Sequence, residues 1–159
     1  MATVYTANTR AVYRAGAYDG THTLGQLRRH GTFGLGALDH NEGEFVMLDG
    51  RGWAVRIDGV FGYVEAGAGA WQPAPYRSLA EVFGEYNWIR HEPTTGTLVG
   101  LAMPECFASI DVPGFHFHWL SEDRLQGGHV IDYAAEGVST EACETTTFVF
   151  DIGSRHRSM

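Results

Sequence analysis

The chain has 159 residues, of which 44% are hydrophobic and 13% aromatic, enough for one ordinary domain with its own core. The net charge is −8 and every basic side chain is an arginine, so no basic face for duplex binding is visible and we expect no nucleic-acid partner. No apolar run approaches the roughly 18 residues of a membrane helix, and arginines interrupt any signal-peptide core, so we expect a cytoplasmic protein without a membrane partner.

The N-terminal third of the chain predicts a weak edge strand and a short helix. Val4 and Tyr5 lie in a weakly alternating segment at the start of the chain. Residues 21–30 predict a helix, because Thr23 and Gln26 have the spacing of a capping box. Gly31 follows directly and is expected to end this helix.

Residues 44–64 form the clearest β region, and two Asp-Gly pairs interrupt it. Asp-Gly between apolar runs is a strong hairpin signal, so Asp49-Gly50 and Asp58-Gly59 each predict a turn. The segments VMLDGRGWAV and VRIDGVFGYV also repeat the same order of strand, Asp-Gly and strand. On the residues alone, we interpret this echo as two ordinary hairpin turns.

The rest of the chain predicts a helix and then a return to strands. Residues 66–75, AGAGAWQPAP, are typical of a loop. Residues 76–86 predict a helix, in which Ser78 and Glu81 form a capping box and an apolar stripe packs into the core. Strands are predicted at 97–102, 115–120, 129–133 and 145–151. The order indicates an α+β fold of mixed or antiparallel sheets with two short helices.

Three histidines are the strongest candidates for chemistry. His116 and His118 are two apart in a predicted strand and therefore share a face, while Phe115, Phe117 and Trp119 point the other way into the core. If the following segment closes an antiparallel hairpin with 118 opposite 129, then 116 faces 131, and His129 joins the same face. Three imidazoles converging from paired strands predict a metal site with open coordination positions on a β-hairpin.

The same residues resemble a known family. VPGFHFHWLSEDRLQGGHVID resembles the metal-site segment of the acetolactate decarboxylases. AGAYDGTHTLGQLRRHGTFGLG is similar to that family's N-terminal helix and following loop, and GEFVMLDG to its first core strand. APYRSLAEVF with GTLVG is similar to its central helix and next strand. The resemblance covers residues 16–133 in the same order.

The resemblance implies a metal-dependent lyase that decarboxylates a 2-hydroxy-3-keto acid to acetoin through a metal-stabilised enediolate or enolate. His116, His118 and His129 match the family's ligands to one divalent metal ion, for which zinc suits best. Glu44 matches a catalytic glutamate near the metal. No other cofactor is implied, and the expected partner is a small-molecule substrate.

The resemblance also implies one domain over residues 1–159, with a shortened N-terminal part at 1–65 and a metal-binding part at 76–159. The chain is shorter than typical members, because the family has a segment between the GEFVMLDG and AVRIDG strands that is missing here. A deletion that joined two similar hairpins would explain the internal echo. It would also expose a sheet edge, so we expect a homodimer that covers the edge.

Two active-site groups of the family are not found. The position of an active-site arginine is occupied by Gly67, and a second glutamate in the family's C-terminal extension has no equivalent. Small residues at 66–70 would widen the cavity where a charged clamp stood, although Arg77 or Arg90 could substitute for the missing arginine.

Three functions therefore stay open. The first is a divergent decarboxylase. The second uses the same metal site for enolate chemistry without loss of CO2, such as cyclisation, isomerisation or aldol-type closure of a larger biosynthetic substrate. The third, from another class, is a non-catalytic module that binds a metal or a small molecule.

Overall fold

Antiparallel strands dominate the computed structural model, which describes residues 2–7, 14–16, 19–20, 22–30, 33–37, 44–48, 55–109, 111–143 and 145–151. The strands are β1 (Ala2–Ala7), β2 (Phe33–Ala37), β3 (Glu44–Leu48), β4 (Val55–Ala68), β5 (Asn87–His91), β6 (Thr94–Met103), β7 (Gly114–Ser121), β8 (Gly127–Ala142) and β9 (Thr145–Asp151). Short helical turns lie between them, namely α2 (Leu24–Leu27), α3 (Leu79–Val82), η2 (Phe83–Glu85) and η3 (Glu105–Phe107).

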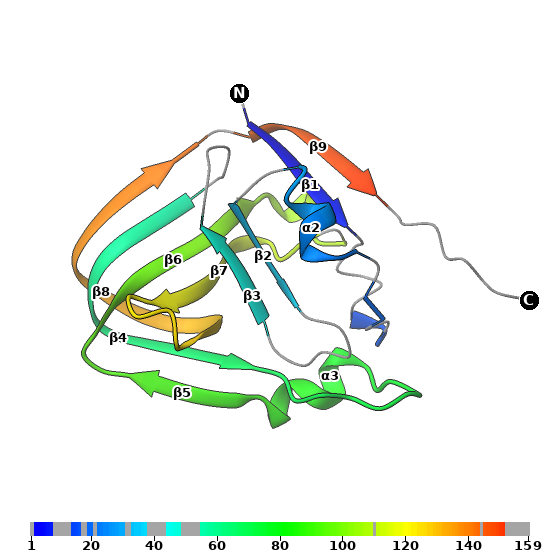
Figure 1. Ribbon diagram of the computed structural model, residues 1–159, viewed down its shortest axis with the longest axis horizontal. Coiled ribbons are helices and arrows are strands. Elements are labelled where there is room, and N and C mark those ends of the chain that lie inside the picture. The colour runs from blue at the N-terminus through cyan, green and yellow to red at the C-terminus, as the bar shows by residue number, and fades with distance from the viewer. Residues whose placement is uncertain are drawn as a thin grey trace, which may run out of the picture.

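The largest sheet has the strand order β5-β4-β6-β7-β8, and β4 also pairs with β8. The ring β4–β6–β7–β8 is therefore closed by hydrogen-bonded pairs (Figure 1). On the edge opposite β8, strand β4 pairs with β6 and then with β5 in one continuous register, with Phe61 opposite Thr94 and Val64 opposite His91. Because the register is unbroken, β5 and β6 extend one another on either side of the Glu92–Pro93 peptide bond.

The hydrophobic core is built from one face of this closed sheet. It consists of Ile57, Phe61, Val64, Ala66, Leu98, Phe117 and Trp119, all of which are buried. Phe117 and Trp119 alternate with the histidines of β7, so burying one face of that strand directs the histidines to the opposite face. The core thus orients the candidate site.

Two smaller sheets accompany the closed ring. β2 and β3 form an antiparallel pair that lies against β6, β7 and β8 (Figure 1). β1 pairs with β9 in parallel, which brings the two ends of the described chain together. The predicted class of mixed and antiparallel sheets with short helices is confirmed.

The predicted turn at Asp58-Gly59 is wrong, because β4 runs straight through it. The Asp58 carboxylate accepts hydrogen bonds from Arg56 Nε (2.6 Å) and from Thr97 Oγ1 on β6 (2.6 Å), so its polar group is satisfied within the sheet. Gly59 has φ +143°, and a Cβ there would collide with the backbone of Gly137 on β8. The glycine is needed for close strand packing rather than for a turn. The other predicted turn, Asp49-Gly50, lies outside the described residues.

Both predicted helices exist but are much shorter than expected. The Thr23–Gln26 capping box is formed, and α2 ends after Leu27. The Ser78–Glu81 capping box is also formed, but α3 tightens into η2 after Val82, and Tyr86 is already extended. Gly84 in this last turn weakens any continuation of the helix.

Several strands differ from their predicted limits. β2 and β5 were not expected, and β4 extends to Ala68 into the segment predicted as a loop. β8 continues to Ala142, well beyond the predicted residues 129–133, because β4 pairs with it over that length. No helix within the described ranges is long and apolar enough to span a bilayer.

Candidate metal centre

His116 and His118 project from the same face of β7, as their spacing predicted. The His118 side chain is almost fully buried, with 2% of its surface exposed. On the opposite face, Phe117 and Trp119 are buried in the core, as expected. Phe115 is 69% exposed, so its predicted place in the core is wrong. The buried core face of β7 therefore begins at Phe117, one residue after His116.

His129 reaches the site because β8 pairs with β7 only briefly. His118 lies opposite His129, as predicted, but the ladder between these strands stops at that pair. The predicted pairing of 116 with 131 is wrong, since β8 turns away from β7 and pairs with β4, where Gly67 is also opposite His129. His129 thus stands at the junction of three strands.

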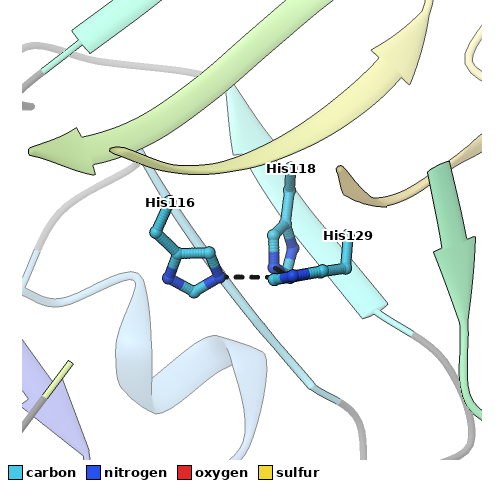
Figure 2. Close-up of side chains that lie close together, drawn as sticks. All are labelled: His116, His118 and His129. Carbon is cyan, nitrogen blue, oxygen red and sulfur yellow. Dashed lines mark hydrogen bonds between the residues drawn. The ribbon is translucent and has the colours of Figure 1, made fainter. Parts of the chain in front are cut away.

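The ring nitrogens of the three histidines have the separations of ligands around one small ion. His129 Nδ1 is 3.2 Å from His116 Nε2 and 3.4 Å from His118 Nε2. One ligand atom of each residue lies within 4.8 Å of the others, and Figure 2 shows the rings converging. Adjacent ligands of a tetrahedral ion at 2.0–2.1 Å are about 3.3 Å apart. The donor set therefore fits a divalent metal ion such as zinc.

The electrostatics favour a neutral histidine at the centre of the group. Burial, and to a smaller extent the neighbouring His116, lowers the pKa of His129 to about 4. The ring is therefore uncharged at neutral pH, and one of its two nitrogens keeps the lone pair that metal binding requires.

Asp111 contacts the site, although the sequence reasoning did not single it out. Its Oδ1 lies 3.1 Å from His116 Nδ1, and both side chains are largely buried. The residue lies in the loop before β7, outside the strand pattern that revealed the histidines. An acidic residue five positions before a ligand was the one signal that could have indicated it.

An aromatic wall formed by Phe83, Tyr86 and Trp88 lies beside His129. The ring centroids of Phe83 and Trp88 are 6.3 Å and 6.4 Å from that of His129. The expected widening of the cavity at Gly67 is wrong, because a Cβ on Gly67 would meet the Trp88 ring at 2.5 Å. Trp88 fills the space that a side chain at position 67 would need.

The two candidate replacements for the missing arginine each form an ion pair with a glutamate. Arg77 forms an ion pair with Glu85 at 2.7 Å. Arg90 pairs with Glu92 at 2.6 Å, and its guanidinium carbon lies 3.4 Å from the centroid of the Tyr63 ring. Both guanidinium groups are thus held by other partners.

Glu44 is the first residue of β3, which lies against β7 and β8, the strands that carry the histidines. Its side chain is outside what the structure describes. The predicted catalytic role of Glu44 stays a prediction, and its backbone position is compatible with that role.

Known proteins resemble this chain over nearly its whole length. The family model described as alpha-acetolactate decarboxylase matches residues 4–56 and 51–157. The alpha-acetolactate decarboxylase of Methanosarcina mazei is 27% identical, over 94% of this chain and 72% of its own length. That of Lactococcus lactis subsp. lactis is 26% identical, over 84% of this chain and 80% of its own length.

Solved structures share the fold. The crystal structure of acetolactate decarboxylase from Bacillus subtilis subspecies spizizenii superposes with a TM-score of 0.92 at 21% identity, covering 98% of this chain and 91% of the other. A Staphylococcus aureus protein, described as of unknown function and similar to alpha-acetolactate decarboxylase, gives 0.84 at 22% identity, covering 93% of this chain and 89% of its own.

The chain is shorter than these relatives. The alignment with the Methanosarcina protein extends over 206 positions, more than the 159 residues present here. The two family matches overlap at residues 51–56, which lie in the connection from β3 to β4 and at the start of β4. This break agrees with the expected missing segment between those strands.

Proposed function

Because the chain belongs to the alpha-acetolactate decarboxylase family, we propose that it is a metal-dependent carbon–carbon lyase acting on a small 2-hydroxy-3-keto acid. The observation that supports this most is the set of ring-nitrogen separations, 3.2 Å and 3.4 Å, among three histidines from two paired strands. In this proposal, His116, His118 and His129 hold one divalent ion, for which zinc suits best.

The chemistry divides between the ion and the chain. The three histidines would hold a divalent cation, which would supply a Lewis acid able to withdraw electron density from a keto oxygen and to stabilise the negative charge left when CO2 departs. The aromatic wall borders His129 with apolar rings. Glu44 holds the proton that the carbon atom receives after the carboxylate has left.

A second candidate function is favoured by Trp88. Where an arginine could bind a substrate carboxylate, this chain has Gly67 covered by the Trp88 ring. An apolar wall suits a less anionic keto compound, so enolate chemistry without loss of CO2 is the alternative. The two functions differ in a measurable product, since only the lyase releases CO2.

The decisive experiment combines metal analysis with product detection. Purified protein is stripped with a chelator, reloaded with zinc and given acetolactate, while CO2 and acetoin are measured. Metal-dependent release of both supports the lyase. Proton exchange on a hydroxyketone without CO2 release supports the alternative, and stoichiometric metal without either reaction indicates a binding module.

Replacement of each histidine tests the site itself. Alanine at position 116, 118 or 129 should reduce bound zinc from one ion per chain to a trace in elemental analysis, because two imidazoles hold zinc poorly. His30→Ala is the matched control, since His30 is exposed and stacks on Tyr5. Full zinc content in all three variants would refute the assigned ligands.

A further inference from the structure

We propose that Asp111 is a positioning residue for the metal centre, holding the His116 ring so that Nε2 presents its lone pair to the ion. This inference rests on the proposed function of the three histidines. It concerns a residue outside that set, in the loop between η3 and β7.

The hydrogen bond between Asp111 and His116 has one chemically sensible direction. A carboxylate only accepts hydrogen bonds, so the contact of 3.1 Å between Asp111 Oδ1 and His116 Nδ1 places the proton on Nδ1. A neutral imidazole has one proton, and the lone pair is therefore on Nε2. That same Nε2 atom faces His129 Nδ1 at 3.2 Å, so the tautomer chosen by Asp111 is the one that binds metal.

Local backbone contacts hold Asp111 in place. Its N–H donates to the Phe107 carbonyl oxygen at 3.0 Å, and its Oδ1 accepts from the Val112 N–H at 2.7 Å. The side chains of Asp111 and His116 are only 18% and 13% exposed. Since water screens a buried hydrogen bond weakly, the carboxylate acts on the ring more strongly than it would on the surface.

A carboxylate behind a metal-bound histidine raises the basicity of the ring and fixes its orientation. Loss of such a partner typically lowers metal affinity about 10- to 100-fold. The opposing interpretation is that Asp111 only ties down the loop before β7. In that case its charge would not affect metal binding.

Asp111→Asn separates these interpretations, because the amide oxygen can still accept from His116 and Val112 while the charge is lost. Asp123→Asn is the matched control. Asp123 lies in the β7–β8 turn, where its Oδ1 accepts from Ser121 Oγ at 2.6 Å and from the Leu125 N–H at 3.0 Å. Both substitutions remove one negative charge from the same part of the chain, but only the first removes it from a histidine partner.

The measurement is the zinc dissociation constant of the full chain in competition with a chromophoric chelator. The visible spectrum of the Co²⁺-loaded protein is a second readout, because its bands report the ligand field rather than fold stability. We expect Asp111→Asn to raise the zinc dissociation constant at least about 10-fold and to change the Co²⁺ bands. Asp123→Asn should leave both within about twofold of the parent.

An unchanged zinc constant in Asp111→Asn, or equal weakening in both variants, would overturn the positioning role while leaving the histidine site intact. A parent protein that binds neither Zn²⁺ nor Co²⁺ would overturn this role together with the proposed function. Circular dichroism of each variant shows whether the fold is kept, and Asp111→Glu, which restores the charge, should recover part of the affinity.

Discussion

At the scale of single residues, the three histidines differ in how their rings are held. His118 is fixed by burial, since 2% of its surface is exposed. His116 is held by the Asp111 carboxylate, and His129 lies edge-on to the Phe83 ring, with an interplanar angle of 82°. Because each ring has its own support, the site does not depend on the ion alone for its shape. Such preorganisation reduces the conformational entropy lost on metal binding.

Glu44→Gln tests the proposed proton transfer without requiring CO2 release. Glutamine has nearly the same shape as glutamate but cannot transfer the proton. Deuterium exchange next to the keto group of acetoin should therefore slow about 100-fold or more. Proton NMR in deuterated buffer measures the exchange. Glu122→Gln, in the exposed β7–β8 turn, should leave the rate unchanged.

Zinc content should be equal in the Glu44→Gln variant, the Glu122→Gln variant and the parent. Exchange at the parental rate in Glu44→Gln would remove Glu44 from the mechanism.

The residues that could be predicted were those whose geometry follows from local periodicity. His116 and His118 share a face because side chains alternate in any strand, and the short turn brings His129 opposite His118. Asp111 could not be found in this way, since its contact depends on a loop conformation. Trp88 was missed for a related reason, because only the pairing of β5 with β4 places it over Gly67.

At the scale of elements, β4 organises the molecule. It pairs with β5 and β6 on one edge and with β8 on the other, and thereby closes the ring. The sequence predicted a turn in the middle of this strand because Asp-Gly is a strong local signal. Pairing with neighbouring strands outweighs this local preference for a turn. Strands on both sides satisfy the backbone groups of β4, and the Asp58 carboxylate accepts a hydrogen bond within the sheet.

The role of Gly59 in this closure can be measured. Its φ of +143° is costly for other residues, and an added Cβ would lie 2.9 Å from Val138 Cα. Gly59→Ala should therefore lower the free energy of unfolding by about 2 kcal/mol, as measured by urea denaturation of the metal-free protein.

Gly84→Ala is the control for this substitution, because an added Cβ in η2 meets no atom within 4 Å. It should be neutral or stabilise the protein by about 0.5 kcal/mol, since alanine restricts the unfolded chain. Equal effects of the two substitutions would show that the approach of β8 to β4 at Gly59 is not tight in solution.

At the scale of the whole molecule, the net charge bears on the choice of substrate, because a shared fold does not fix what a protein acts on. The fold is shared with acetolactate decarboxylase from Bacillus subtilis subspecies spizizenii at a TM-score of 0.92. The net charge of −8, however, repels an anionic keto acid, and Arg77 and Arg90 form ion pairs with Glu85 and Glu92. Neither the net charge nor these two ion-paired arginines therefore helps to hold a substrate carboxylate.

We therefore expect slow turnover of acetolactate despite normal metal binding. One missing charge-assisted hydrogen bond is worth about 1.5–3 kcal/mol, and each 1.36 kcal/mol is about tenfold in rate, so the absent arginine alone costs one to two powers of ten. The apparent KM for acetolactate should also fall several-fold as NaCl rises from about 0.02 M to about 0.2 M, because salt screens the repulsion. Deuterium exchange into neutral acetoin should not respond to salt. Acetoin formation from acetolactate at roughly 10 per second or more, independent of salt, would show that a cation other than Arg77 and Arg90 binds the carboxylate.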